Sequence, residues 1–154
     1  MDYVTVKWLH VLSSTILFGT GVGSAFYLYF ASRVRDVHAV AFVARYVVIA
    51  DTIFTATTAI FQPLSGWYLA KLAGFPLTQR WLALSIALYV LAGACWLPVV
   101  WIQIRMRDLA VDAAARGEPL PPRYFALLRT WTILGMPAFA AFVAIFWLMI
   151  AKPA

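Results

Sequence analysis

The chain has 154 residues, of which 64% are hydrophobic and 12% are charged, and its mean hydropathy is +0.86. A water-soluble globular domain does not have this composition, so we expect a single-domain integral membrane protein. The net charge of +6 does not indicate nucleic-acid binding, because the basic residues lie at the edges of apolar runs, where they act as topology signals.

Four apolar stretches are long enough to cross a bilayer, since about 20 helical residues span a hydrocarbon core of roughly 30 Å. They are Tyr3–Phe30, Tyr46–Leu72, Trp81–Ile104 and Phe125–Ile150. A backbone in lipid must satisfy its own hydrogen bonds, so each stretch is expected to be a helix. The sequence predicts an all-α, polytopic four-helix bundle with up-down-up-down order. The first stretch is far longer than the apolar part of a signal peptide, so we expect a true span.

The first span carries one ionisable side chain, His10, on the order of 10 Å inside the surface at about 1.5 Å per residue. Ser14, Leu17, Gly21 and Ser24 follow it along one side of the helix. Such a group costs a few kcal/mol unless it is neutral, bonded or coordinated. Two interpretations remain open: an interhelical hydrogen bond, or axial ligation of haem iron by the neutral imidazole.

The three glycines of this span, Gly19, Gly21 and Gly23, resemble a phosphate-binding loop only superficially. A nucleotide fingerprint needs a strand before it and a helix start after it, and neither is present. The spacing of Gly19 and Gly23 instead predicts close helix packing, or room for a flat ligand.

The second span is the most polar, with Asp51 near its start and four threonines after it. An aspartate within a membrane helix normally needs a partner. Arg45, Arg105 and Arg129 stand at about the same depth, so we predict an ion pair that clamps three spans together, with a proton relay as the alternative.

Prolines interrupt three of the spans. Pro63 removes one backbone hydrogen bond, which predicts a bend in the second span near the depth of His10. Gln62 lies beside it in the outer half of the same span. Pro98 and Pro137 are expected to act similarly in the third and fourth spans.

The basic residues are unevenly distributed between the two ends of the bundle. Eight arginines lie at the end with the first and third loops, and four basic residues lie at the other end. The positive-inside rule therefore predicts cytoplasmic first and third loops and periplasmic termini in a bacterial inner membrane. The eight are Arg33, Arg35, Arg45, Arg105, Arg107, Arg116, Arg123 and Arg129, and the four are Lys7, Lys71, Arg80 and Lys152.

The third loop, "RMRDLAVDAAARGEPLPPR", begins with good helix formers. We expect the third helix to continue for about three turns beyond the membrane, to about Arg116, and to stop at Gly117. Pro119, Pro121 and Pro122 then prevent further helix.

Six tryptophans are expected to form aromatic belts at the two interfaces. His38 is expected to be solvated, and one cysteine with two distant histidines makes no zinc ligand set. The four methionines make a poor copper site. The belts are Trp8, Trp67, Trp81 and Trp147 at one face, with Trp101 and Trp131 at the other.

Four segments carry a resemblance to a family of bacterial predicted integral membrane proteins of unknown function. They are "YVTVKWLHVLSSTILFGTGVGSAFYLYF", "LAGACWLPVVWIQIRMRDLA", "PLPPRY" and "PAFAAFVAIFWLMIAKP". This resemblance covers essentially the whole chain and implies no activity.

A more distant similarity concerns the run from Val6 to His10, which resembles the first helix of HemJ-type protoporphyrinogen oxidases and of CopD-like membrane proteins. HemJ-type proteins are small four-helix haem b proteins in which the first-helix histidine is implicated in haem binding. Only His10 and Lys7 match, and the third span has no lysine. The resemblance thus implies a haem b protein and, if it is an enzyme, a HemJ-like oxidoreductase.

On this interpretation His10 is the axial ligand of the iron and Lys7 pairs with a propionate. Trp8 and Trp67 form walls of the macrocycle site. The remaining residues assigned to cofactor binding are Ser14, Gly21 and Gln62.

We expect electron transfer or porphyrin-linked redox chemistry, with a quinone or another redox partner. A homodimer sharing one haem is a further arrangement. The alternative is a cofactor-free accessory subunit or a small transporter that uses Asp51 and its surrounding arginines.

Overall fold

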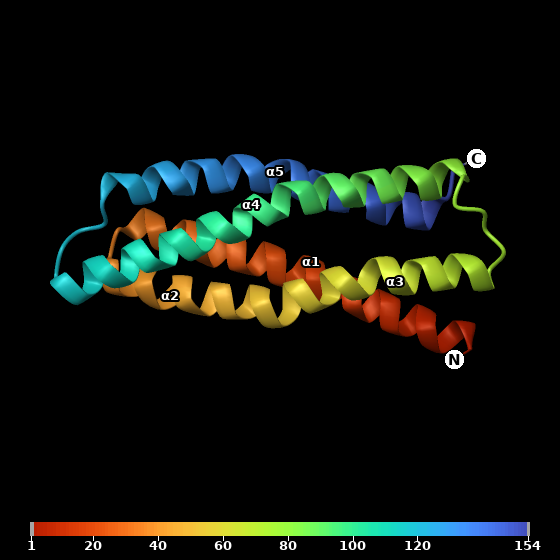
Figure 1. Cartoon of the computed structure of the whole chain (residues 1–154), viewed down its shortest axis with the longest axis horizontal. Coiled ribbons are helices and arrows are strands. Elements are labelled where there is room, and N and C mark those ends of the chain that lie inside the picture. Colours follow the sequence, from red (N-terminus) through yellow and green to blue (C-terminus); the bar gives the residue numbers. More distant parts are fainter. Residues whose placement is uncertain (1, 154) are drawn as a thin grey trace.

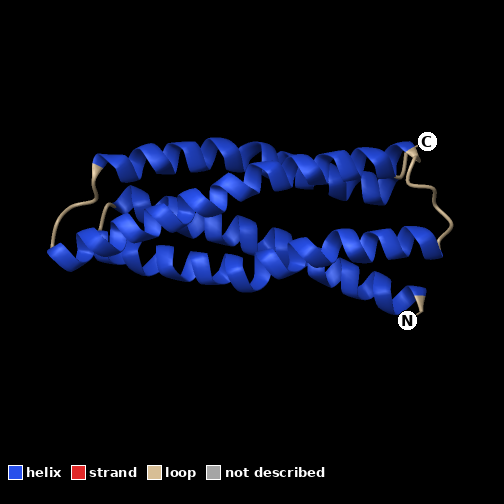
Figure 2. Ribbon diagram, in the orientation of Figure 1, coloured by secondary structure: helices blue, strands red, loops and turns tan. Residues whose placement is uncertain are grey.

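The computed structural model describes residues 2–153, in which four long helical spans run up and down in an all-α bundle (Figures 1 and 2). The first span is α1 (Tyr3–Val34), the third is α4 (Arg80–Arg116) and the fourth is α5 (Pro122–Ala151). The second span is continuous from Val37 to Leu72. Both ends of the chain lie at the same end of the bundle, which we call the terminal end. The opposite end, with most of the arginines, is the arginine end.

The second span changes its helical pitch once. It consists of α2 (Val37–Ala50), one π-helical turn η1 (Asp51–Thr55) and α3 (Ala56–Leu72). The backbone N–H of Ala56 donates to the carbonyl of Asp51, five residues earlier. Turns of this kind often occur at functional sites. This turn was not predicted from the sequence.

The connection between the first two spans is shorter than predicted. α1 ends at Val34 and α2 begins at Val37, so the expected loop over residues 31–45 is wrong. Arg35 takes a left-handed conformation with φ 62°, and the Asp36 carboxylate accepts the first free N–H groups of α2, at 2.9 and 3.1 Å. The charged residues of this segment lower its hydropathy. The helix forms because its apolar side, including the buried Val40, packs in the bundle.

All four spans are longer than a hydrocarbon core requires. α4 has 37 residues, which is about 55 Å at about 1.5 Å per residue. It ends at Arg116, and Gly117 has φ 66°, the left-handed conformation expected for a glycine after a helix. The chain then keeps Leu120 buried and enters α5 at Pro122.

Exposed aromatic side chains mark two levels on the outside of the bundle. Trp8 and Trp67 lie near the terminal end. Tyr27 and Tyr46 lie toward the arginine end of the same two spans, the first and the second. Along each helix the two levels are about 30 Å apart at about 1.5 Å per residue, which matches a hydrocarbon core. Trp81 and Trp131 are only 5% and 7% exposed, so they belong to the core and not to the predicted belts.

The arginine end contains the main apolar core. Every span contributes buried side chains to it, and most of them lie at or beyond the aromatic level marked by Tyr27 and Tyr46. The core residues are Leu28, Val40, Ala41, Ala44, Val47, Val99, Ile102, Met106, Ala110, Leu120, Tyr124, Leu128 and Trp131.

The terminal end is organised as two helix pairs, with α1 against α3 and α4 against α5 (Figure 1). Its apolar cluster is small and has no buried member from α1; it comprises Ala70, Trp81, Leu82 and Leu148. α1 contacts α5 mainly through Phe18, whose ring lies 5.3 Å from that of Phe146 and 5.6 Å from that of Phe139.

α3 runs through Pro63 without a change of helix type. The missing N–H of Pro63 leaves the carbonyl of Ala59 without its helical donor. The Tyr89 hydroxyl of α4 donates to that carbonyl at 2.6 Å. The proline therefore creates a hydrogen bond between α3 and α4. The irregular turn lies earlier in the span, at Asp51–Thr55. The bend at Pro63 stays a prediction.

Candidate functional site

A line of buried polar side chains follows the inner side of the second span. Its members are Asp51, Thr55, Thr58, Gln62 and Ser65, all less than 10% exposed. The alternating spacing of three and four residues keeps them on one face of a helix. From Asp51 to Ser65 this polar seam covers about 21 Å at about 1.5 Å per residue, which is most of a hydrocarbon core.

His10 lies at the terminal end of the polar seam. Its Nδ1 is 2.7 Å from the Ser65 hydroxyl, and Gln62 Nε2 donates to the His10 carbonyl at 2.9 Å. A Cβ added to Gly66 would lie 3.3 Å from His10 Cε1. The absence of a side chain at Gly66 therefore allows the imidazole to lie against α3.

The Ser65 hydroxyl has one proton, and its oxygen lies 2.7 Å from both His10 Nδ1 and the carbonyl of Phe61. In the arrangement in which this proton goes to the Phe61 carbonyl, His10 Nδ1 donates to the Ser65 oxygen and the neutral ring has an unprotonated Nε2. Within residues 2–153 no hydrogen bond reaches Nε2. A nitrogen in this state can accept a proton or coordinate a metal ion, with its ring held through Nδ1.

Asp51 lies at the other end of the seam and connects three spans. Its Oδ1 accepts from the Thr55 hydroxyl at 2.8 Å, and its Oδ2 accepts from Gln103 Nε2 of α4 at 2.7 Å. Gln103 Oε1 accepts from the indole N–H of Trp131 on α5 at 3.1 Å. All four residues are buried. Both carboxylate oxygens are therefore satisfied inside the bundle.

The ion pair predicted between Asp51 and Arg45, Arg105 or Arg129 is wrong. These arginines are exposed, and Arg105 lies over the ring of Trp101 at 5.5 Å. A neutral amide satisfies the carboxylate without burying a second charge, which would carry its own desolvation penalty. Among residues 2–153 the ion pairs join near neighbours in sequence: Arg107 to Asp108 and Arg116 to Glu118.

A small cavity of about 90 Å³ borders Asp51 and Gln103. Trp96 also lines it, and the buried Nε1 of Trp96 has no hydrogen-bond partner in the described part of the chain. The cavity is large enough for water molecules and has polar groups to bind them. Asp51 therefore borders a small cavity, in addition to its direct hydrogen-bond partners.

Most of the other residues predicted to bind a cofactor lie apart from His10. Lys7 lies over the Tyr3 ring at 5.7 Å, and Trp8 and Trp67 are 62% and 54% exposed on the outside of the helices. Ser14 donates to its own helix, to the carbonyl of Val11, at 2.7 Å. Of the predicted set the structure brings only Gln62 to His10.

The structure adds Ser13, Ser65 and Gly66 to the surroundings of His10. Ser13 lies one turn along α1, and its Oγ is buried without a hydrogen-bond partner among residues 2–153. Ser65 could have been found from the sequence, because it continues the spacing of Asp51, Thr55, Thr58 and Gln62.

The glycines of α1 do not pack against another helix of this chain. A Cβ added to Gly19, Gly21 or Gly23 would meet nothing within 4 Å. The close helix packing predicted from their spacing is therefore absent within the chain, and the close approach of α1 to α3 occurs at Gly66. Residues 2–153 also contain no group of three or more His, Cys, Asp or Glu side chains that could hold a metal ion.

Four helices that are long and apolar enough to cross a bilayer define an integral membrane protein. Residues 4–153 match the family described as predicted integral membrane protein (DUF2269), and the chain belongs to that family. No curated protein and no solved structure matches the chain. None of these comparisons shows the similarity to HemJ-type and CopD-like proteins that was expected from the residues around His10.

Proposed function

We propose that the protein binds haem b, or a related porphyrin, through Nε2 of His10 and acts in electron transfer or porphyrin-linked redox chemistry. The observation that supports this proposal is the hydrogen bond between His10 Nδ1 and Ser65, which leaves Nε2 unprotonated when Nδ1 is the donor. Haem-ligating histidines need this tautomer and a partner that orients the ring. When bound, a haem would supply one-electron chemistry.

The surroundings of His10 fit one side of such a group. Ser65 orients the ring, Gly66 leaves space for it, and the buried Ser13 hydroxyl is free to bind a polar group. Trp8 and Trp67 face outward, so they do not enclose a ligand within one copy. A symmetric homodimer could supply the second wall and a second imidazole. The open Gly19–Gly23 surface of α1 is suited to close approach by another helix.

The absorption spectrum tests the proposal directly. Full-length protein purified from cells with ample haem should show a Soret band that His10→Ala abolishes. His38→Ala is the matched control, because His38 is exposed at the arginine end and should leave the band unchanged. Ser65→Ala should weaken haem affinity by about 10- to 100-fold, the usual effect of removing an orienting partner. Colourless wild-type protein, or a band that survives in His10→Ala, would overturn the proposal.

A second candidate is a cofactor-free subunit or small transporter that moves protons or cations along the polar seam. The observation that favours it is the buried Asp51, which begins the π turn and borders a small cavity. In proteoliposomes with a pH-sensitive dye, Asp51→Asn should abolish proton flux. Asp112→Asn, which changes an exposed carboxylate of α4, should retain it. Absence of flux in the wild type would exclude this candidate for protons.

We also propose that the arginine end is cytoplasmic and that the membrane is the bacterial inner membrane. The excess of arginines at that end supports this orientation. In a Cys95→Ser background, a membrane-impermeant maleimide should label Ala73→Cys in intact cells and leave Ala115→Cys unlabelled. Both positions are exposed, at opposite ends of the bundle. The reverse labelling pattern would invert the topology.

A further inference from the structure

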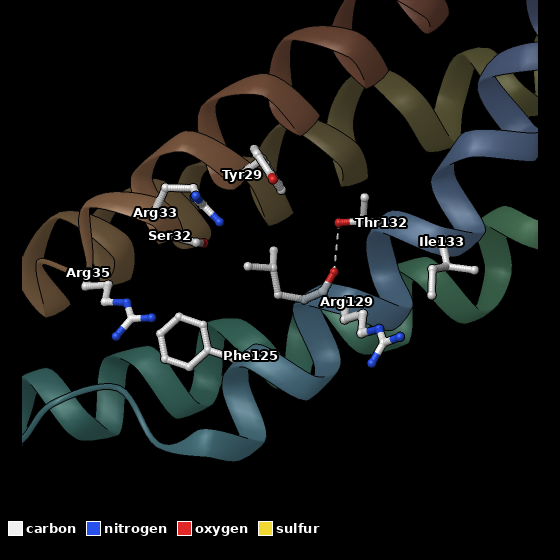
Figure 3. A pocket seen from close by; sticks show the side chains of 9 residues that line it. Tyr29, Ser32, Arg33, Arg35, Phe125, Arg129, Thr132 and Ile133 are labelled. Carbon is white, nitrogen blue, oxygen red and sulfur yellow. Dashed lines mark hydrogen bonds between the residues drawn. The ribbon is translucent and has the colours of Figure 1, made fainter.

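A groove of about 650 Å³ opens between α1 and α5 at the arginine end (Figure 3). Arg33 and Arg35 lie on its α1 side, and Phe125, Arg129 and Ile133 lie on its α5 side. None of these residues belongs to the polar seam or to the surroundings of His10. The groove is therefore a separate feature of the molecule.

The groove exists because α1 and α5 touch at two separated levels. At the arginine end, the fully buried Tyr124 hydroxyl and the Ser32 hydroxyl are hydrogen-bonded at 2.7 Å. Further along, Phe18 packs against phenylalanine rings of α5. Ser32 and Phe18 are about 21 Å apart along α1 at about 1.5 Å per residue, and the groove begins beside the first contact.

The arginines of the groove have no acidic partner. Neither Arg33, Arg35 nor Arg129 forms an ion pair with any of residues 2–153. Arg35 lies over the Phe125 ring at 5.1 Å, as Figure 3 shows. The nearest carboxylate in sequence, Asp36, is engaged by backbone N–H groups of α2. Figure 3 shows the Arg129 head group pointing away from Arg33 and Arg35, which lie on the α1 side of the groove. Guanidinium groups without an acidic partner favour an anion, and their geometry suits the oxygens of a phosphate.

The groove has a charged part and an apolar part at different membrane depths. Arg33 and Arg35 lie beyond the exposed Tyr27, which marks the interface on α1. Ile133 lies two turns into α5 from Phe125, toward the hydrocarbon region. A ligand that fills the groove would therefore need an anionic group at headgroup level and an apolar group at acyl-chain level.

We propose that this groove binds an anionic phospholipid, with its phosphate at Arg33 and Arg35, an acyl chain along Leu128 and Ile133, and Arg129 adding positive charge on the α5 side. A free phosphate shares the anionic chemistry, but it would leave the apolar wall without a partner. Basic pockets between membrane helices are a known way to hold acidic headgroups. The site does not depend on haem binding or on the polar seam.

Selective lipid binding is the test. Full-length protein is placed in nanodiscs or detergent and titrated with phosphatidylglycerol, with phosphatidylcholine as the neutral comparison. The groove variant combines Arg33→Gln, Arg35→Gln and Arg129→Gln. A charge-matched control combines Arg45→Gln, Arg105→Gln and Arg123→Gln, which are exposed arginines outside the groove.

We expect the wild type to prefer phosphatidylglycerol. The groove variant should lose at least tenfold more affinity for it than the control variant. Equal losses in both variants, or equal binding of both lipids, would overturn the site. Displacement of the lipid by millimolar inorganic phosphate or glycerol phosphate would identify a free-phosphate site and contradict the lipid assignment.

Ile133→Trp gives an independent check that leaves every charge in place. Its larger side chain should fill the apolar part of the groove and weaken phosphatidylglycerol binding by several-fold. Met136→Trp is its control, because Met136 is exposed on α5 and does not line the groove. Unchanged binding in Ile133→Trp would contradict the placement of an acyl chain there.

Discussion

The two ends of the bundle are held together by different forces. At the arginine end, all four spans meet in an apolar core that lies largely at or beyond the interfacial aromatic level. At the terminal end the helices form two pairs, and polar contacts such as His10–Ser65 join α1 to α3. Burial of apolar surface drives packing only where water is the alternative, whereas helices in lipid associate through close packing and hydrogen bonds. The apolar core is therefore suited to holding the four spans together at the arginine end. The terminal end is suited to carrying polar groups such as His10.

Shortening a side chain in the apolar core should cause the largest loss of stability among the tests of this difference between the two ends. Met106 is fully buried among the four spans, so Met106→Ala should lower the free energy of unfolding by about 2–5 kcal/mol. Leu12→Ala, on a lipid-facing part of α1 that is 43% exposed, should cost less than about 1 kcal/mol. Reversible unfolding in mixed micelles measures both. Similar losses in the two variants would contradict a core concentrated at the arginine end.

Breaking the Asp51 network should have a smaller but specific effect. Gln103→Leu leaves Asp51 Oδ2 and the Trp131 indole N–H without partners, which should cost about 2 kcal/mol. Trp131→Phe should have a comparable cost, because the Gln103 oxygen loses its donor and the smaller ring leaves part of the core unfilled. In the double variant the losses should not add, since both changes act on one network. Additive losses would show that the network is not coupled.

The smallest effects are expected at two glycines, Gly66 on α3 and Gly21 on α1. Gly66→Ala must displace the His10 ring by a few tenths of an ångström, because its Cβ would lie 3.3 Å from Cε1. Gly21→Ala meets nothing within 4 Å and should stabilise α1 by about 0.5–1 kcal/mol. His10 ring NMR shifts should change in Gly66→Ala and stay constant in Gly21→Ala. A loss of stability in Gly21→Ala would reveal a packing partner, such as a second copy.

The number, order and helical character of the spans could be predicted, because apolar length and backbone hydrogen bonding leave few alternatives in lipid. The end of α4 could also be predicted, since Gly117 can take the left-handed conformation at little cost. The start of the second span could not be located from hydropathy, because the arginines and Asp36 lower the mean hydropathy of this segment. The segment is nevertheless helical, outside the hydrocarbon region.

The partner of Asp51 was mispredicted because depth alone does not say which way a side chain faces. Arg105 has a suitable depth and the opposite charge, yet it is exposed. Gln103 shares the buried face of α4 with Val99 and Met106, a periodicity that is visible in the sequence. Of the residues around His10, only Gln62 was predicted. Ser65 could have been added because it continues the spacing of the polar seam, but the role of Gly66 depends on interhelical geometry.

The π turn at Asp51–Thr55 sets the rotation of α3 relative to α2. A π turn contains about one residue more than an α-helical turn, so the side chains after it face a different direction from the one that an uninterrupted α-helix would give them. In an α-helix, one residue corresponds to a rotation of about 100°. If this turn reverted to a regular α-helix with all of its residues retained, Gln62 and Ser65 would therefore rotate by about that angle, away from α1. A defect introduced near the arginine end would misalign the imidazole about 20 Å away, without altering any residue that touches it.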